Sequence, residues 1–269
     1  MTLTEAIGVL KNAGVEDAAH DARIIFKDIG KISDTELFGG NPVADKAVEE
    51  AILRRKEREP LQYILGAVDF YRERYKVTED CLIPRSETEL LVDLAVKLLP
   101  SGAAFADLCT GSGCIAISVL KNTRDTSAFA LELSERALDL ARYNAAQNGV
   151  ADRIVFIHKD VLSAAPTGKV FAVLSNPPYV TDDAFSALEP EIYREPRMAF
   201  IGGGDDGADF YREIVRLWYD SVEKGGFFLF EIGYDQKAAL LDIANKYALE
   251  CEIKKDYSGH DRMALLRKG

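Results

Sequence analysis

The sequence is poor in the residues that bind metals and form cross-links. It has three histidines, scattered at His20, His158 and His260, and four cysteines with no C-x-x-C pair among them. This pattern predicts neither a metal site nor a disulfide framework, and it is typical of a protein from a reducing compartment. The sequence also lacks an apolar N-terminal segment and any apolar run of about 18 residues, so we expect a cytoplasmic protein with no membrane contact.

Positive charge is scarce as well. The chain has 33 Lys and Arg residues against 44 Asp and Glu residues, which gives a formal net charge of −11. A protein that holds a nucleic-acid backbone releases counterions from phosphates, and this requires a basic surface. We therefore expect no direct nucleic-acid partner. A net negative charge instead suits a basic protein partner, because complementary fields speed their encounter.

The periodicity divides the chain into three parts. Residues 1–59 contain only helical patterns, which predict a small bundle; Thr2 with Glu5 matches a capping box, and Asn41-Pro42 matches the start of the third helix. Residues 60–80 include an alternating segment that predicts a β-hairpin linker. Over residues 81–269 helices and strands alternate, which is typical of a mostly parallel α/β sheet.

The motif Asn176-Pro177-Pro178-Tyr179 follows the apolar run of residues 170–174. Prolines have a fixed φ and no N–H, and each restrains the residue before it, so this loop presents acceptors on a stiff backbone. The side-chain oxygen of Asn176 and the carbonyl of Pro177 suit the two hydrogens of a planar NH2 group, and Tyr179 is placed to cover its flat face. The alternative is a rigid turn without a ligand.

A second motif, rich in glycine, lies upstream between a predicted strand and a helix. Glycines in such a connection let the backbone approach a ligand closely. The next predicted strand ends in Glu132, and an acid at this interval suits the two hydroxyls of a ribose. The predicted contacts to an adenosine-like ligand are Asp107, Cys109, Thr110, Gly111, Ser112, Gly113 and Glu132.

This ligand is a dinucleotide or S-adenosylmethionine, which share the ribose and the adenine. A dinucleotide needs its pyrophosphate on the helix N-terminus, whereas S-adenosylmethionine carries an ammonium group that Asp107 is placed to pair with. Alternatively, Asp107 caps the turn through its own backbone. The N-P-P-Y motif favours methyl transfer, because parallel strands bring both motifs to one edge of the sheet. Asp160 and Val161, after the strand of residues 154–158, meet the adenine or form a simple strand-end turn.

Beyond these two motifs, the chain resembles the HemK/PrmC family, the protein-glutamine N5-methyltransferases that modify peptide chain release factors. Ser86 replaces the second proline of the family's I-P-R-P-E-T-E stretch, and Cys109 stands where many members have glycine, which visits φ > 0 at lower cost. The resemblance extends over roughly residues 60 to 265. Its segments are residues 60–66, Phe70-Tyr71, residues 82–89, Glu195-Pro196-Arg197, residues 203–207, residues 230–233 with Gln236, and Asp261-Arg262.

The resemblance implies a seven-stranded, Rossmann-like class I methyltransferase domain over residues 81–269, with its last pair of strands antiparallel. It also implies a small N-terminal helical bundle for substrate recognition, S-adenosylmethionine as cofactor and S-adenosylhomocysteine as product. The implied substrate is the glutamine of the Gly-Gly-Gln motif in class I peptide chain release factors, and we expect the enzyme to be a monomer.

Within this resemblance, Asn176, Pro177 and Tyr179 are the expected catalytic residues. No side-chain base deprotonates an amide near neutral pH, so they would act by positioning the nitrogen. The expected substrate contacts also include Pro178, Arg85, Glu87 and Arg197, and Asn176 is expected to contact the cofactor as well. Arg197 and the glycine-rich loop after it otherwise read as a flexible surface loop.

Three other functions stay open. The first is methylation of a glutamine in a ribosomal protein. The second is methylation of an adenine or cytosine amino group in nucleic acid, which the charge disfavours. The third is a non-catalytic nucleotide-binding module, which would not need an intact N-P-P-Y motif.

Overall fold

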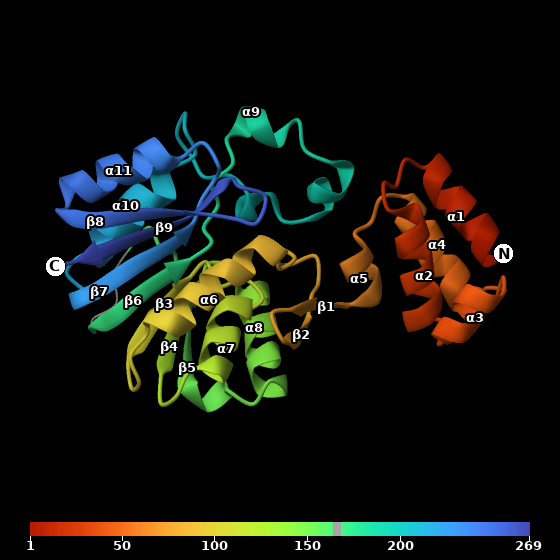
Figure 1. Cartoon of the computed structure of the whole chain (residues 1–269), viewed down its shortest axis with the longest axis horizontal. Coiled ribbons are helices and arrows are strands. Elements are labelled where there is room, and N and C mark those ends of the chain that lie inside the picture. The colour runs from red at the N-terminus through yellow and green to blue at the C-terminus, as the bar shows by residue number, and fades with distance from the viewer. Residues whose placement is uncertain (164–167) are drawn as a thin grey trace. The chain divides into compact units, whose positions relative to one another are not determined.

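The computed structural model describes residues 1–163 and 168–269 and divides into two compact units (Figure 1). The first unit consists of Met1–Val68, Val77–Glu79 and Glu189–Glu195. The second consists of Asp69–Lys76, Asp80–Leu188 and Pro196–Gly269. Each unit is therefore assembled from stretches that are separated in the sequence.

Short helices form most of the first unit. They are α1 (Leu3–Asn12), α2 (Ala18–Asp28), α3 (Asp34–Gly39), α4 (Lys46–Lys56), α5 (Leu61–Leu65) and the 3₁₀ turn η3 (Pro190–Arg194). Their apolar faces bury Leu10, Ile25, Phe26 and Ile52 completely. The predicted capping box at the start of α1 is confirmed, because the Thr2 hydroxyl accepts from the Glu5 N–H and the Glu5 carboxylate accepts from the Thr2 N–H.

The prediction of a helix start at Asn41-Pro42 is wrong. Helix α4 begins at Lys46, where the Asp45 side chain accepts from the Val48 N–H at 2.9 Å. The Asn41 side chain accepts instead from the backbone of Thr4 at 2.9 Å, and the Pro42 carbonyl accepts from Leu3. These residues are thus used in tertiary contacts with α1, which override their local preference for a helix start.

An ion-pair cluster ties the Glu189–Glu195 stretch to the rest of the first unit. Glu191 accepts from Arg55 at 2.8 Å and from Arg58 at 2.7 Å. Arg55 is buried and also donates to Asp21 at 2.7 Å. Because a buried guanidinium needs its partners, Glu191 is a structural part of this unit.

The second unit contains a seven-stranded sheet in the described residues, with the order β5-β4-β3-β6-β7-β9-β8. Its strands are β3 (Ala104–Leu108), β4 (Ser127–Glu132), β5 (Ile154–His158), β6 (Val170–Ser175), β7 (Val222–Glu231), β8 (Leu249–Lys255) and β9 (Asp261–Lys268). Strand β9 is antiparallel to both β7 and β8, and the other pairs are parallel. The predicted Rossmann-like fold is confirmed. The strand order reverses direction between β3 and β6, which is where open α/β sheets bind their ligands.

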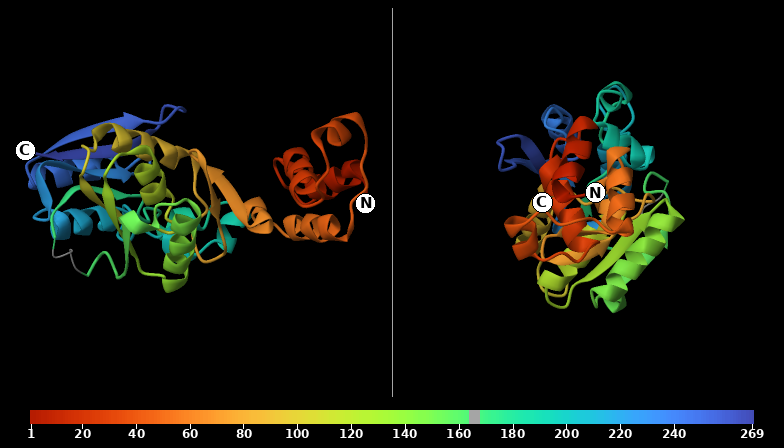
Figure 2. Two further views of the ribbon diagram at one scale, coloured as in Figure 1. Left: turned by 90° about the horizontal axis from the view of Figure 1, so that it is seen from below. Right: turned by 90° about the vertical axis from the view of Figure 1, so that its right-hand side faces the viewer.

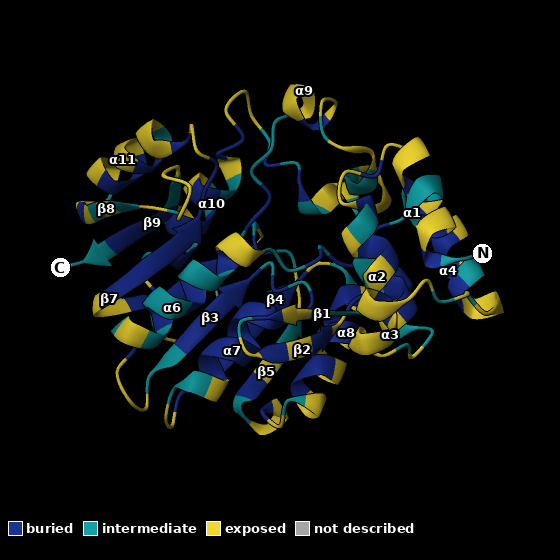
Figure 3. Cartoon of the chain, turned by 45° about the vertical axis from the view of Figure 1, so that its right-hand side comes forward, coloured by how far each residue is buried: buried dark blue, intermediate teal, exposed yellow. Residues whose placement is uncertain are grey.

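Helices cover both faces of this sheet. Helices α6 (Glu89–Leu98), α7 (Cys114–Asn122) and α8 (Glu135–Gln147) lie on one face, and α10 (Asp209–Trp218) and α11 (Lys237–Lys246) lie on the other (Figure 1). The same layers can be followed in two further directions in Figure 2. Most residues of the central strands are buried, although Glu223, Lys224 and Gly225 near the start of β7 are exposed, and the outer surfaces of the helices are exposed (Figure 3).

Aromatic side chains fill the layer between the sheet and α10. Trp218, Tyr211, Phe228 and Phe230 are fully buried there, and the Tyr211 and Phe230 rings meet at 5.4 Å. The remaining elements are short: the hairpin strands β1 (Ala67–Phe70) and β2 (Glu73–Lys76), the helix α9 (Asp182–Phe185), and the 3₁₀ turns η1 (Ser86–Thr88), η2 (Ala151–Arg153) and η4 (Arg197–Ala199). Because its core is tightly packed in this way, the sheet gives the loops at its carboxyl edge a rigid base.

Candidate active site

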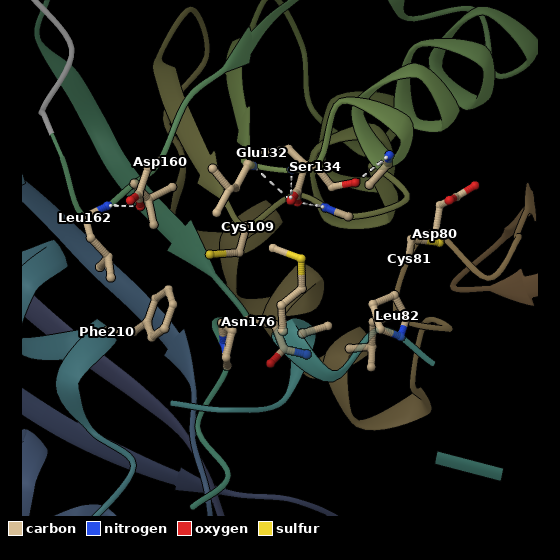
Figure 4. A pocket seen from close by; sticks show the side chains of 18 residues that line it. Asp80, Cys81, Leu82, Cys109, Glu132, Ser134, Asp160, Leu162, Asn176 and Phe210 are labelled. Atoms are coloured by element: carbon tan, nitrogen blue, oxygen red, sulfur yellow. Dashed lines mark hydrogen bonds between the residues drawn. The ribbon is translucent and has the colours of Figure 1, made fainter. Parts of the chain in front are cut away.

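A pocket opens at the carboxyl ends of β3, β4 and β6 (Figure 4). Strand β3 pairs with β4 on one side and with β6 on the other, so the residues that follow these three strands meet there. Of the residues predicted from the sequence, the pocket is lined by Cys109, Gly111, Glu132, Asp160, Val161, Asn176 and Pro178. The structure thus brings the glycine-rich motif and the N-P-P-Y motif to one site.

Three residues in the turn after β3 have a positive φ, and the surroundings of each are different. A Cβ on Gly111 (φ 55°) would meet nothing within 4 Å, so this glycine leaves space open at the pocket. A Cβ on Gly113 (φ 82°) would lie 3.0 Å from the Ile117 side chain and 3.2 Å from Ala141, so this glycine allows α7 and α8 to pack. Cys109 (φ 59°) is not a glycine, and this conformation costs an L-residue about 1–2 kcal/mol.

The Cys109 side chain faces the pocket, in surroundings that disfavour its thiolate form (Figure 4). Burial, with further contributions from nearby Glu132 and Asp107, raises the pKa of the Cys109 thiol well above its usual range. A thiol nucleophile must be deprotonated. Cys109 therefore contributes shape to the pocket wall.

Asp107 lies at the end of β3 and is fully buried. Its Oδ2 accepts from the Thr110 hydroxyl at 2.6 Å and from the Ala116 N–H at 3.2 Å. Its Oδ1 has no hydrogen-bond partner among the described residues. Burial raises the pKa of Asp107 to about 7. A buried oxygen without a partner is costly, so this atom suits a cationic donor such as an ammonium group.

Glu132 ends β4, and its carboxylate is fixed by backbone N–H groups (Figure 4). Its Oε2 accepts from Gly111 at 2.9 Å, and its Oε1 accepts from Leu133 at 2.9 Å and from Ser134 at 3.0 Å. Glu132 also lines the pocket. A carboxylate has about four acceptor positions, and these N–H groups use three of them, so Glu132 keeps one position, on Oε2, for a ligand hydroxyl in a fixed orientation.

Asp160 and Val161 lie beyond β5 and line the same pocket. The Asp160 Oδ1 accepts from the Leu162 N–H at 2.8 Å, which forms a strand-end turn. Leu162 and the Phe210 ring lie on the same side of the pocket as Asp160 (Figure 4). Together these residues offer an apolar wall of the kind that accommodates a flat heterocycle.

Asn176 and Tyr179 of the N-P-P-Y motif are both connected to one buried carboxylate, that of Glu231. The Asn176 Nδ2 donates to Thr88 Oγ1 at 3.2 Å, and the Thr88 hydroxyl donates to Glu231 Oε2 at 2.6 Å. The Tyr179 hydroxyl donates to Glu231 Oε1 at 3.3 Å. Burial raises the pKa of Glu231. It also raises the pKa of Tyr179, so the phenol stays protonated.

The glycine-rich loop after Arg197 packs against the back of N-P-P-Y. The Val180 N–H donates to Phe200 at 2.7 Å, and the Gly202 N–H donates to Val180 at 3.0 Å. A Cβ on Gly207 would lie 2.2 Å from the Tyr179 carbonyl oxygen, so only glycine fits there. Gln236 donates to the same carbonyl at 3.0 Å. This loop therefore supports the motif from behind.

The pocket lining does not include the predicted substrate contacts Pro177, Tyr179, Arg85, Glu87 and Arg197. Arg197 is exposed, pairs with Asp182, and lies over the Phe185 ring at 5.5 Å. Arg85 is half-buried, and Glu87 is exposed and accepts from the Ser86 hydroxyl at 3.1 Å. Any contact that Arg85, Glu87 or Arg197 makes with a substrate therefore lies outside the pocket wall.

The sequence reasoning missed several residues of the site, among them Thr88, Glu231, Leu162 and Phe210. Glu231 carried a signal, because an acid at the end of a long apolar strand is unusual unless it has partners. Thr88 carried none beyond its place in the family-like segment.

Among the described residues, no group of three His, Cys, Asp or Glu side chains is arranged to hold a metal ion. In residues 1–163 and 168–269, no helix is long and apolar enough to cross a membrane.

Comparisons with known proteins place the chain among methyltransferases. The model of the PrmC N-terminal domain matches residues 2–66, and that of the methyltransferase small domain matches residues 86–204. The chain is 36% identical to the release factor glutamine methyltransferase of Thermodesulfovibrio yellowstonii over 92% of both chains. It is 34% identical to that of Caulobacter vibrioides over 97% of this chain and 93% of the relative. A methyltransferase structure from Pyrococcus furiosus shares the fold, with a TM-score of 0.55 and 19% identity over 72% of this chain and 88% of that one.

Proposed function

This chain belongs to the family of release factor glutamine methyltransferases, and we propose that it methylates the glutamine of the Gly-Gly-Gln motif in class I peptide chain release factors. The methyl group would come from S-adenosylmethionine and go to the side-chain amide nitrogen. The observation that carries this proposal is the shared pocket, which is lined both by Gly111 and Glu132 and by Asn176 and Pro178.

The residues on the β3 and β4 side fit S-adenosylmethionine. Glu132 keeps one free acceptor position, on Oε2, for a ribose hydroxyl, and the unpartnered Oδ1 of Asp107 suits the ammonium group. Asp160, with the apolar wall at Phe210, suits the adenine. Thr110, Ser112 and Gly113 shape the turn that holds these groups. When bound, the cofactor supplies a methyl group on a positively charged sulfur.

The residues on the β6 side fit a primary amide. An amide nitrogen is a weak nucleophile because its lone pair is shared with the carbonyl, so catalysis depends on alignment. Asn176 Oδ1 and the Pro177 carbonyl would accept the two N–H bonds and stabilise the charge that the nitrogen gains. Tyr179 would hold the amide plane. No general base is needed, because one N–H proton leaves to water after the new bond forms.

The remaining parts of the proposal concern the protein substrate. The helical bundle of residues 1–59 would recognise the release factor, and residues 81–269 would catalyse the reaction. Residues 60–80 would connect the bundle to the methyltransferase domain. Pro178, Arg85, Glu87 and Arg197 would contact the polypeptide around the glutamine. The enzyme would act as a monomer and without nucleic acid, in keeping with its net charge of −11.

Transfer of labelled methyl from S-adenosylmethionine tests this function. The acceptors are purified release factor, the same factor with Gln→Ala in its Gly-Gly-Gln motif, ribosomal protein, and duplex DNA. We expect label on the intact factor alone. Label on ribosomal protein or DNA alone would show that methyl transfer is correct but that the proposed substrate is wrong. Absence of label on every acceptor, with cofactor bound, would reject the proposed methyltransferase activity.

A further inference from the structure

One carboxylate is connected to both ends of the N-P-P-Y motif. Glu231 is almost completely buried, and its two oxygens serve different partners. Oε2 reaches Asn176 through the Thr88 hydroxyl, while Oε1 accepts from Tyr179 directly. The Tyr211 hydroxyl donates to the backbone carbonyl of Glu231 at 3.0 Å, which fixes the residue itself.

The direction of these hydrogen bonds follows from the groups involved. Thr88 has a single hydroxyl hydrogen, and an ionised Glu231 can only accept, so at 2.6 Å the hydrogen lies between Thr88 and Glu231. Thr88 Oγ1 can then only accept from Asn176. An asparagine donates only through its Nδ2, so the Asn176 Oδ1 must face away from Thr88.

We propose that Thr88 and Glu231 are positioning residues that hold the Asn176 amide with Oδ1 toward the acceptor nitrogen. This inference rests on the proposed function, because the acceptor is an amide NH2 group. If the Asn176 amide turned over, it would present its own NH2 to the NH2 of the glutamine. Two donors cannot share a hydrogen bond, and the alignment of the acceptor would be lost.

The protonation of Glu231 would control this orientation. A protonated Glu231 can donate to Thr88, whose hydroxyl hydrogen is then free to point at Asn176 Oδ1. The charged and titratable groups around Glu231 are Arg262 of β9, Tyr179 and Glu87. Burial raises the pKa of Glu231, Glu87 adds to this, and Thr88, Arg262 and Tyr179 oppose it. Transfer should therefore fall on the acid side at a higher pH than an ordinary glutamate would give.

Thr88→Val tests the relay, because valine keeps the shape of threonine without its hydroxyl. We expect kcat to fall by about 10²-fold, the effect of a misplaced reacting group, while KM for the release factor and cofactor affinity change little. Thr88→Ser should recover most of the loss. Equal kcat for the valine and serine variants would overturn the proposal.

Ser118→Ala is a matched control. The Ser118 hydroxyl is also buried and also donates to a buried glutamate, Glu73, at 3.2 Å. Neither residue lines the pocket. Its loss should lower the melting temperature without changing kcat. A fall in kcat equal to that of Thr88→Val would mean that any buried hydroxyl has this effect, and it would overturn the relay.

The Glu231→Gln variant separates the effect of Glu231 on the orientation of Asn176 from its effect on the stability of the fold. A raised folded-state pKa means that ionised Glu231 costs stability at neutral pH; this cost decreases as the pH falls through the folded-state pKa and is absent below the unfolded-state pKa. Glutamine carries no charge, so the melting temperature should stay equal or rise, while kcat falls and the acid limb of the kcat profile at saturating cofactor disappears. An unchanged acid limb would contradict the assignment to Glu231.

A readout that does not depend on activity keeps the inference separate from the proposed function. In protein labelled with ¹⁵N-asparagine, Asn176→Asp identifies the Asn176 side-chain NH2 signal by removing it. We expect one of its hydrogens to exchange slowly with solvent in the wild type and in Thr88→Ser, and rapidly in Thr88→Val. Equal exchange in all three would reject the positioning role. Slow exchange in a wild type that does not methylate release factor would reject only the proposed function.

Discussion

The two ends of the pocket are held in different ways. At the proposed cofactor end, defined by Glu132 and the turn after β3, the Glu132 carboxylate is fixed by the backbone N–H groups of Gly111, Leu133 and Ser134. At the acceptor end, defined by N-P-P-Y, the Asn176 amide is fixed by the side chains of Thr88 and Glu231. Backbone donors are present whatever the side chain is. The acceptor end therefore depends on residue identity at distant positions, and the cofactor end does not.

The largest effect should come from removing the acceptor itself. Asn176→Ala deletes one of the two oxygens that align the glutamine amide, so the rate of methyl transfer should fall by about 10³-fold. Cofactor affinity should be spared, because the Asn176 side chain bonds to Thr88 and not to the cofactor end. Single-turnover transfer and calorimetric cofactor titration measure the two quantities. Turnover within a few fold of wild type would refute the acceptor role.

A smaller effect is expected at the cofactor end. Glu132→Ala removes the proposed acceptor of a ribose hydroxyl and should weaken cofactor binding by about 1–3 kcal/mol. With cofactor at saturation, kcat should change much less than it does in Asn176→Ala. Calorimetric titration gives the affinity. If affinity is unchanged, the ribose lies elsewhere, and the contrast between the two ends disappears.

The pH dependence of cofactor affinity sharpens the contrast further. Burial raises the pKa of Asp107 to about 7, and an ammonium group binds the ionised form. Below pH 7 the free protein must first lose this proton, so affinity should fall by up to about tenfold per pH unit. Titrations between about pH 5.5 and 8 measure it. Asp107→Asn is the control and should flatten the profile; an equally steep profile in that variant would exclude Asp107.

The smallest effect concerns the backbone of the cofactor end. Cys109 has a φ of 59°, and glycine would relieve about 1–2 kcal/mol of strain while adding about 0.4–1 kcal/mol of unfolded-state entropy. Cys109→Gly should therefore change the free energy of unfolding by less than about 1–2 kcal/mol, in the stabilising direction. Cys109→Val, with a β-branched side chain at positive φ, should destabilise. Urea denaturation measures both, and the reverse order would show that φ does not limit stability here.

The same contrast explains what the sequence could predict. Glu132 was found because its strand, the glycine turn and the acid follow one another along the chain. Thr88 was missed because its partners are 88 and 143 residues away, at Asn176 and Glu231. Nothing in local spacing reports such a contact.

The wrong helix start at Asn41-Pro42 has the same origin. Both residues suit a helix N-terminus by local preference, but contacts with Thr4 and Leu3 use them instead. Asp45 then starts α4. The elements of the sheet were predicted well, because buried parallel strands separated by helices produce strong local patterns.

The ion pairs of Glu191 affect how the protein could be taken apart or recombined. A gene fragment that stops after residue 68 would encode α1 to α5 but not the carboxylate that neutralises Arg55 and Arg58. Arg55 would keep only Asp21 as a charged partner in its buried position. The helical unit is therefore not encoded by one continuous stretch of the sequence. A chimera that exchanges it between two relatives would need to carry residues 189–195 from the same parent.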